Sequence, residues 1–527
     1  MKKLFTISLL LILGSFCLKA QTPRTVIIEP NKGFLDDMIM ADTLANGQRK
    51  DLNTVYVLRN GATYLIQGVF ENKGWPLNIK AETATGKKPY VRPYPQLDGT
   101  INGRLFTLSG AGKFENIYFD GEGEDAALRP CTIIFYSSYE GFKLELEGCI
   151  LANAGQSGLQ IFKATEYVKV NNCRFYNMGR MAFNDFGNGR VLDGRDTQFG
   201  LVSFTNCTFV NNVDRIIRHR NSTGAIKQLV FDHNTIVNSI NYHGFMELGF
   251  VGKSVQITNN LMVDCMGLGA DQTDVTRLSE LNQHTEKDGA GNPKMVWVGS
   301  VPNDTTKFTI SHNIYTITAP QQTWYNSHTL TEGPILTDHI KAKLGTGAAT
   351  AWLKKGFTLP NIPAPPVDFY KFYWTPTPDG AGKTKMTTAV VDYNKMTTDY
   401  WLNTLNCKYS VTDPSFLGKD GVPVGDPNWG SSIVTGINEM RNPRVALVNY
   451  PNPFSDYTTL RFKTEQFSEV KIEIFDITGK VVRHIDAGTF APGENTFVIQ
   501  RENMKSGMYF LRLNTGSNSY FSNLIVK

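Results

Sequence analysis

The middle of the chain repeats a short pattern of alternating apolar and polar residues. Each repeat has apolar residues at every second position, then Asn or Cys, then a second short apolar stretch that often ends in Asn. Period-two patterning interrupted by a single corner predicts strand, bend and strand in each repeat. The segments that share the pattern are residues 114–121, 144–153, 168–177, 202–211, 229–238, 255–264 and 308–316.

The spacing of the corner residues predicts a solenoid. From Cys149 through Cys173, Cys207 and Asn234 to Asn260 the corners follow at intervals of 24 to 34 residues. One such strand cannot bury its inward face, whereas coils stacked about 4.8 Å apart share a continuous core. We therefore predict an all-β fold, a single-stranded right-handed parallel β-helix. The longer interval from Asn260 to Asn313 predicts two coils.

Aligned corners place like residues on top of one another. We expect side-chain amide ladders from the corner asparagines, which are residues 172, 206, 234, 259, 260 and 313. Cys149, Cys173 and Cys207 occupy equivalent corners, so they should point inward as small apolar residues. An even number of cysteines in an exported chain also allows disulfides. The exchange of Cys for Asn at equivalent corners favours the inward position.

The two ends of the chain differ from the repeats. Residues 1–20 have the charged, apolar and small-residue order of a cleavable signal peptide. Anchoring of a lipid at Cys17 is disfavoured because Phe16 stands where a small residue is expected. From about Val445 short alternating strands separated by turn residues predict a small immunoglobulin-like β-sandwich. The predicted parts are a signal peptide at 1–20, a cap and first coils at 21–110, the β-helix at 111–320, an irregular capping region at 321–440 and the sandwich at 445–527.

The last 80 or so residues carry several ordered motifs. They are Asn449-Tyr450-Pro451-Asn452-Pro453-Phe454, Thr478-Gly479-Lys480 after an apolar strand, Gly507-Met508-Tyr509 and the final Lys527. This order resembles the type A C-terminal sorting domain of the type IX secretion system. The resemblance implies export across the outer membrane, with the secretion machinery as a partner, and a secreted or cell-surface protein. An ordinary immunoglobulin-like binding module is the alternative.

Charge and hydropathy narrow the partners further. A net charge of +5 is mild for 527 residues, and no block of Lys and Arg stands out. The sequence therefore gives no case for nucleic acid. No long apolar run follows the signal peptide, so no membrane-spanning segment is expected in the mature chain.

One repeat carries an unusual charge density, in the stretch Asp214-Arg215-Ile216-Ile217-Arg218-His219-Arg220. If Ile217 and His219 face inward, alternation places Arg218 and Arg220 on the outer face. Counting eleven residues on from each corner places five residues on that face: Gln160, Asn184, Arg218, Phe245 and Asp271. If the count is allowed to shift by two residues, Glu247 lies beside Arg218 and Arg220, and Asp185 lies on the other side. A mixed-charge stripe of this kind suits an acidic polysaccharide, because guanidinium groups bind carboxylates bidentately.

The same stretch gives a second, local resemblance. Asn206-Cys207-Thr208-Phe209-Val210-Asn211 followed by Arg218-His219 is similar to family-six polysaccharide lyases, which are alginate and dermatan lyases. The N-terminal coils, with residues 54–93, likewise resemble β-helix (pectate-lyase-like) polysaccharide lyases. The resemblance to family-six polysaccharide lyases implies β-elimination on a uronate, with Arg218 as the catalytic arginine. The family's catalytic lysine is missing, since Thr197 stands at its place and only Arg195 is near.

The predicted site consists of two catalytic candidates, Arg218 and Arg195, and six substrate-binding candidates. The latter are Arg220, Arg215, Asn184, Asp185, His243 and Glu247. No cofactor is identified and no metal ligand is assigned; calcium is considered because Asp193 and Asp196 lie near the place of the family's acidic calcium-binding run.

Three functions stay open at this point. The first is a lyase acting on a uronate polysaccharide, and the second is a non-catalytic glycan-binding or adhesin-type β-helix. The third, a glycoside hydrolase, needs two carboxylates about 5–9 Å apart, for which Asp185 with Glu247 or Asp193 with Asp196 are the pairs. A plain surface ion-pair network of the arginines with Asp185, Asp214 and Glu247 is the structural alternative.

Overall fold

The structure is a computed structural model that describes residues 23–125, 128, 130–179, 188–195, 197–220, 224–271, 277–278, 286–289, 291, 293–373, 404–434, 447–464, 466–515 and 519–527. The predicted signal peptide, Asn184, Asp185 and Asp196 lie outside these residues. The chain divides into two compact units, Met1–Val434 and Thr435–Lys527.

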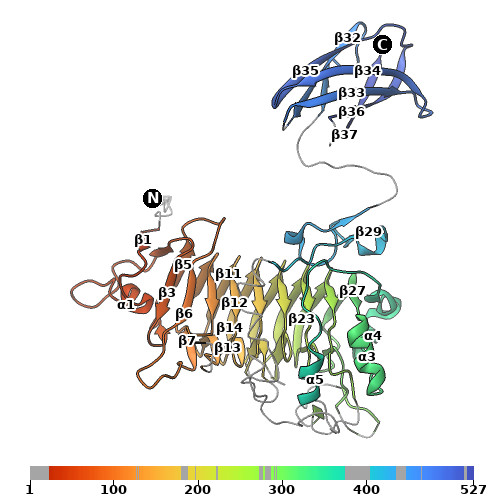
Figure 1. Ribbon diagram of the computed structural model, residues 1–527. Helices are drawn as coiled ribbons and strands as arrows, with labels where there is room; N and C mark the ends of the chain where they lie inside the picture. The colour runs from red at the N-terminus through yellow and green to blue at the C-terminus, as the bar shows by residue number, and fades with distance from the viewer. Residues whose placement is uncertain are drawn as a thin grey trace, which may run out of the picture. The chain divides into compact units, whose positions relative to one another are not determined.

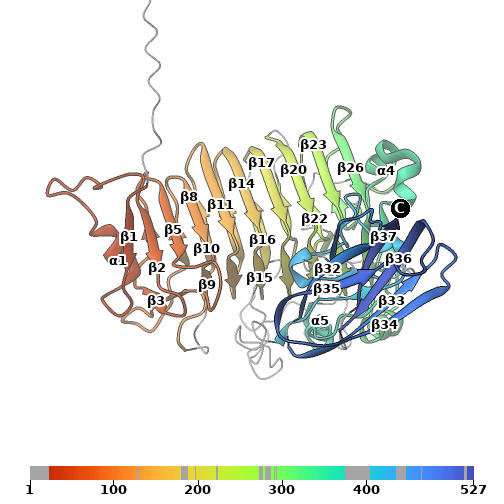
Figure 2. The same ribbon diagram turned by 90° about the horizontal axis from the view of Figure 1, so that it is seen from above.

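The first unit is a right-handed parallel β-helix, as the repeats predicted (Figures 1 and 2). Its described residues form three parallel sheets of ten, eight and ten strands. Sheet 1 contains β1 (Thr25–Ile28), β2 (Val55–Leu58), β5 (Leu77–Ala81), β8 (Gly112–Glu115), β11 (Phe142–Glu147), β14 (Thr165–Asn171), β17 (Phe199–Thr205), β20 (Ile226–Asp232), β23 (Val251–Thr258) and β26 (Lys307–Ser311).

The other two sheets run beside it. Sheet 2 contains β4 (Phe70–Glu71), β7 (Arg104–Thr107), β10 (Ile133–Ser137), β13 (Ser157–Ile161), β16 (Arg190–Gly194), β19 (Ile217–His219), β22 (Met246–Glu247) and β25 (Val298–Gly299). Sheet 3 contains β3 (Thr63–Ile66), β6 (Tyr90–Pro93), β9 (Tyr118–Asp120), β12 (Ile150–Ala152), β15 (Arg174–Tyr176), β18 (Thr208–Val210), β21 (Thr235–Val237), β24 (Leu261–Val263), β27 (Asn313–Thr316) and β28 (Trp352–Lys354). Each coil passes through sheet 1, sheet 3 and sheet 2 in that order.

Two residues make the corner between sheet 1 and sheet 3. The first has positive φ, as at Asn172, Asn206 and Asn259 with φ of 54°, 55° and 59°, a conformation that Asn tolerates better than most residues. The second residue points inward and stacks on its counterparts. This inward column holds Cys149, Cys173, Cys207, Asn234, Asn260 and Asn313, all buried.

The inward column is hydrogen bonded from coil to coil. Asn234 N donates to Asn260 Oδ1 at 2.9 Å, and Asn260 N donates to Asn313 Oδ1 at 3.1 Å. The amide ladder is therefore confirmed for these three residues, whereas Asn172, Asn206 and Asn259 bond instead to Glu147, Asn171 and Asp232. The cysteines of the described chain are free and buried, which confirms the inward position of Cys149, Cys173 and Cys207.

The prediction of two coils between Asn260 and Asn313 is wrong. Leu261 pairs directly with Ile314, so the two corners lie on neighbouring coils. The additional residues leave the solenoid between sheet 3 and sheet 2, because sheet 2 resumes only at Val298. An insertion within one coil has the same length as two coils, so spacing alone does not distinguish them.

Short helices close both ends of the coil core. At the first coil, α1 (Leu35–Met40) buries Leu35 and Ile39 against it. At the last coil, α4 (Asp338–Leu344) and the 3₁₀ helix η2 (Gly345–Thr350) lead into Ala351 and Trp352, and Ile340 of α4 is fully buried. The inner core therefore has no open end among the described residues.

Two later segments cover the outside of the coils. Residues 404–434, with the 3₁₀ helices η4 (Pro414–Phe416) and η5 (Pro427–Trp429) and the strands β29 (Ser410–Val411) and β30 (Ser432–Ile433), pack on the outer face of sheet 3. The helices α3 (Ala319–Ser327) and α5 (Val367–Tyr373) pack on Val213, Ile240 and Tyr242, which precede the strands of sheet 2.

The second unit is a β-sandwich of two antiparallel sheets. One contains β31 (Val448–Tyr450), β32 (Tyr457–Thr464) and β35 (Gly493–Gln500); the other contains β34 (Val481–Phe490), β33 (Ser468–Phe475), β36 (Gly507–Asn514) and β37 (Ser519–Val526). Alternate residues such as Leu460, Phe462, Ile472 and Leu511 point between the sheets and form one apolar core.

Candidate functional site

The outer face of sheet 2 carries one column of polar residues. Strand register places Gln160, Asp193, Arg218 and Glu247 side by side on four consecutive coils. Arg218 faces outward as predicted, while Ile217 is part of the inner core and His219 bonds to the carbonyls of Leu248 and Thr197. Glu247 stands beside Arg218, as the slipped count expected. The residue on the other side is Asp193, not Asn184 or Asp185, because the preceding coil is longer than its neighbours.

Loop residues complete the column into a cluster, here called the arginine cluster. It consists of Arg190, Asp193, Arg195, Asp214, Arg215, Arg218, His243 and Glu247. Asp193 accepts from Arg218 Nη1 at 3.1 Å and Arg195 Nε at 2.8 Å, and lies 3.4 Å from Arg190 Nη1. Arg215 contacts Asp214 at 3.1 Å and also forms an ion pair with Glu247.

The ion pairs of Arg215 with Asp214 and Glu247 are those of the ion-pair alternative, but these residues are buried and do not lie on the surface. Arg215 is 1% exposed and Arg218 is 5% exposed. Asp214, Arg215 and His243 lie in the loops that lead into β19 and β22, and these loops fold over the strands' outer side chains. The adjoining Val213 and Tyr242 pack against residues of α3 and α5. Each charged side chain that is buried here needs a partner of opposite charge, since unpaired charges would be very costly to bury.

The charges of the cluster do not balance among the described residues. Four guanidinium groups, those of Arg190, Arg195, Arg215 and Arg218, face the three carboxylates of Asp193, Asp214 and Glu247. Burial and the neighbouring Arg190 lower the pKa of Arg218 to about 9, against the opposing effect of Asp193. Arg218 thus remains charged at neutral pH and is short of negative partners.

Both central aspartates are held ionised. Burial alone would raise the pKa of Asp193, but the guanidinium groups of Arg190, Arg218 and Arg195 bring it below its usual range. Burial alone would also raise the pKa of Asp214, but Arg215 and His243 more than offset this effect, so the pKa of Asp214 is lowered as well. Neither aspartate is suited to act as a general acid, since an acid must carry a proton at working pH.

His243 is neutral and has one free ring nitrogen. Burial lowers its pKa to about 3 despite the nearby Asp214. Its Nδ1 lies 3.0 Å from Asp214 Oδ1 and 3.1 Å from Arg215 Nη2. The bond to Asp214, a carboxylate that only accepts, needs the proton on Nδ1, whereas the contact to the guanidinium of Arg215, which only donates, needs Nδ1 unprotonated. With the proton on Nδ1, Nε2 is an unprotonated acceptor, and it has no hydrogen-bond partner among the described residues.

Arg218 Nε, a donor, and Glu247 Oε1, an acceptor, are also buried and have no hydrogen-bond partner among the described residues. Buried polar atoms are nearly always hydrogen bonded in folded proteins. Such atoms are satisfied by groups outside the described residues, by water, by an ion or by a ligand.

The cluster continues to the surface along sheet 2. The side chain of Arg195 is 24% exposed, and its guanidinium lies 6.0 Å from the ring centre of Phe162, which is itself 41% exposed. Phe162 packs against Tyr136 at 5.6 Å between ring centres, and Arg104 lies 3.4 Å over the Tyr136 ring. Arg104, Tyr136, Phe162 and Arg195 form the surface strip.

The structure brings together five of the predicted site residues: Arg195, Arg215, Arg218, His243 and Glu247. Arg220 ends outside the cluster, half-buried after β19, and Asn184 and Asp185 lie outside the described residues. Sequence reasoning missed Arg190 and three residues of the surface strip, Arg104, Tyr136 and Phe162. The strip had a signal, because Phe162 follows Gln160 by two and so shares its outward face.

The described residues hold no group of three or more His, Cys, Asp or Glu side chains arranged for a metal ion. Asp193, which was considered for calcium, is instead occupied by guanidinium groups. No helix within the described part of the chain has the length and apolar character needed to cross a membrane.

Comparison with known proteins decides the role of the second unit. Residues 448–527 match the family described as secretion system C-terminal sorting domain. The sandwich is a type IX sorting domain. The chain is therefore exported, to the cell surface or beyond, and the type IX secretion machinery is its partner. No curated protein matches the chain.

Proposed function

We propose that the β-helix binds an acidic polysaccharide along sheet 2, through the surface strip and the arginine cluster. The observation that carries this proposal is the excess of one guanidinium over the carboxylates among the described residues of the cluster, together with the Nε of Arg218, which has no partner among those residues. A uronate carboxylate supplies the missing charge and accepts from that donor. Guanidinium groups bind carboxylates in a planar, two-bond geometry that suits this role.

The surface strip supports a sugar ligand in particular. Tyr136 and Phe162 offer flat aromatic faces, and Arg104 and Arg195 lie against them. Aromatic faces provide a large contact area at a low entropic cost. The combination of ring faces with guanidinium groups fits a polymer of acidic sugars better than a simple anion.

Elimination on the bound uronate is the second candidate function, and His243 favours it. A lyase needs a cation that neutralises the carboxylate and a base that removes the adjacent proton. Arg218 fits the first requirement, and Nε2 of His243, in the tautomer that carries its proton on Nδ1, fits the second. Thr197 holds the place at which the lyase resemblance calls for a lysine, and Asp193 is the neighbour of Arg218 on the preceding coil, so the base of this mechanism is His243.

The test combines binding and turnover on the full chain. Calorimetric titration with oligomers of galacturonate, mannuronate and guluronate should show binding that Arg195→Gln and Phe162→Ala each weaken about tenfold, or about 1.4 kcal/mol. The control, Lys169→Gln, changes an exposed lysine on sheet 1. Equal binding by all variants would refute the proposal. Ultraviolet absorbance of the unsaturated product separates the two functions, since elimination requires a signal that His243→Gln abolishes while binding persists.

A further inference from the structure

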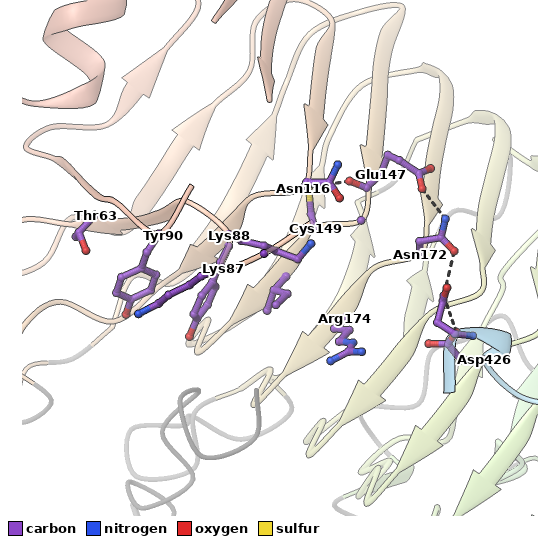
Figure 3. Close-up of a pocket in the computed structure, with 16 residues that line it drawn as sticks. Thr63, Lys87, Lys88, Tyr90, Asn116, Glu147, Cys149, Asn172, Arg174 and Asp426 are labelled. Carbon is purple, nitrogen blue, oxygen red and sulfur yellow. Dashed lines mark hydrogen bonds between the residues drawn. The ribbon is translucent and has the colours of Figure 1, made fainter. Parts of the chain in front are cut away.

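A second hollow lies on the outer face of sheet 3, and it shares no residue with the arginine cluster. It is a groove of about 1060 Å³ whose lining includes Thr63, Lys88, Tyr90, Asn116, Arg174 and Asp426. Figure 3 shows Tyr90, Lys88 and Arg174 along one side, with Glu147, Asn172 and Asp426 toward the end where the C-terminal segment of this unit crosses the coils. The sequence pattern gave no indication of it.

The floor of the groove is one column of sheet 3. Thr63, Tyr90, Tyr118, Ile150 and Arg174 stand in register on five consecutive coils. At about 4.8 Å per coil this column is roughly 19 Å long. The next residue of the column, Thr208, is covered, because its hydroxyl donates to Asp426 Oδ2 at 2.7 Å and accepts from Trp429 Nε1 at 2.9 Å.

The two tyrosines form a fixed pair in which Tyr90 is half-buried and Tyr118 is 5% exposed. Their ring centres are 4.6 Å apart, and both hydroxyls donate to Asp120 Oδ2, at 2.8 Å from Tyr90 and 3.1 Å from Tyr118. The polar ends are therefore already bonded, so a ligand meets rigid aromatic surface. Such surface binds apolar faces of a sugar without a large loss of side-chain entropy.

The cations of the groove lack carboxylate partners. Lys88 is partly buried and forms no ion pair or hydrogen bond with a described residue, and burial lowers its pKa. Arg174 stacks 4.5 Å over the Trp429 ring and forms no ion pair with a carboxylate in the described chain. The nearby carboxylates are already bonded: Glu147 accepts from Asn171 and Asn172, and Asp426 accepts from Thr208 and Asn428.

We infer that this groove is a second saccharide site, which binds an anionic oligosaccharide with its acidic groups at Lys88 and Arg174 and its sugar faces on Tyr90 and Tyr118. The two cations supply the charge that the carboxylate or sulfate of the sugar needs. The length of the column fits a short run of sugars and exceeds what a single small anion would occupy. The inference is independent of the proposed function, because the two sites lie on different sheets.

Calorimetric titration of the full chain tests the inference. The probes are galacturonate hexamers, a heparin hexasaccharide, a neutral glucan hexamer and acetate at the same carboxylate concentration. We expect Lys88→Gln to weaken binding of one or both acidic hexamers about tenfold, while Lys88→Arg restores it and Lys169→Gln leaves it unchanged. Tighter binding of galacturonate identifies a carboxylate ligand, and tighter binding of heparin identifies a sulfate ligand. The neutral glucan should not bind at this site.

Three outcomes would overturn the inference. They are equal binding of both acidic hexamers by wild type and Lys88→Gln, equally tight binding of acetate, and binding of the neutral glucan that Lys88→Gln also weakens. The fold is checked by an unchanged thermal midpoint. Arg195→Gln separates the two proposals: if it has no effect while Lys88→Gln weakens binding, the sheet 2 site fails and the groove stands. The reverse result refutes the groove alone.

Discussion

Arg218 and Asp193 stand side by side on neighbouring coils, with Nη1 of the arginine 3.1 Å from Oδ1 of the aspartate. Asp193 also bonds Arg195 and lies within ion-pair distance of Arg190, so one carboxylate serves three guanidinium groups. The pair therefore holds the cluster together and still leaves it positively charged. Asp193 consequently stabilises the folded chain and at the same time weakens the binding of an anion.

Replacing Asp193 by Asn should separate these two effects. The variant leaves three guanidinium groups without their shared carboxylate, which should cost about 3–5 kcal/mol of stability. Binding of an acidic oligosaccharide should become tighter, because the four guanidinium groups then face only the carboxylates of Asp214 and Glu247. All seven tryptophans precede residue 435, so tryptophan fluorescence during urea unfolding reports on the β-helix unit alone. A stable variant with unchanged affinity would contradict both expectations.

Acidification should destabilise the β-helix through His243. Its pKa is about 3 in the folded chain and about 6.5 in an unfolded one. The folded value is the lower one, so its contribution to stability is complete above pH 6.5 and is lost as the pH falls toward 3. Between pH 6.5 and 5 the loss should be about 2 kcal/mol.

The measurement is the urea midpoint at pH 7 and pH 5 for wild type and His243→Gln. The variant cannot take up this proton, so its midpoint should change less than that of wild type over this interval. Parallel changes in the two proteins would show that another group is responsible.

Removing one amide from the inward ladder should destabilise the coils on both sides of it. Asn260 Oδ1 accepts from N and Nδ2 of Asn234, and its Nδ2 donates to Phe231 O and Asn313 Oδ1. Asn260→Ala leaves several of these buried groups unsatisfied, at a cost of about 2–4 kcal/mol. The control is Asn46→Ala in an exposed loop, which should change stability by less than about 0.5 kcal/mol. Similar losses in both would exclude the ladder as the cause.

The cysteines should be unreactive in the folded protein. The described chain holds six free and buried cysteines, Cys131, Cys149, Cys173, Cys207, Cys265 and Cys407. Burial raises the pKa of Cys131, Cys207, Cys265 and Cys407, which suppresses the reactive thiolate. A colorimetric thiol reagent should detect almost no thiol in native mature protein and six in denaturant. Fewer than six in denaturant would indicate disulfides.

The fold could be predicted because its determinants are local and repeated. Alternation fixes which residues point inward, and the corners at Asn172 and Cys173 recur in a recognisable form on each coil. The number of coils was harder to predict, because the alternating pattern does not distinguish the insertion between Asn260 and Asn313 from an additional coil. The sorting domain was recognised by its ordered motifs and is confirmed by the family match at 448–527.

The candidate site was only partly accessible from sequence. Alternation placed Arg218 outward and Glu247 beside it, but the burial of both depends on loops, α3 and α5 from distant parts of the chain. Arg190 and Asp214 join the cluster through loop conformation, which periodicity does not encode. The sheet 3 groove exists because the cover by residues 404–434 ends at Arg174, which stacks on Trp429, and no residue pattern within the coils records where a separate segment ends.

The closed ends of the coil stack have a consequence for an exported protein. An open parallel β-helix would present unpaired strand edges above an apolar core, and copies could join end to end into fibres. Here Leu35 and Ile39 of α1 seal one end, and Ile340 of α4 with Trp352 seals the other. These caps cover the two apolar ends through which copies could otherwise join into fibres.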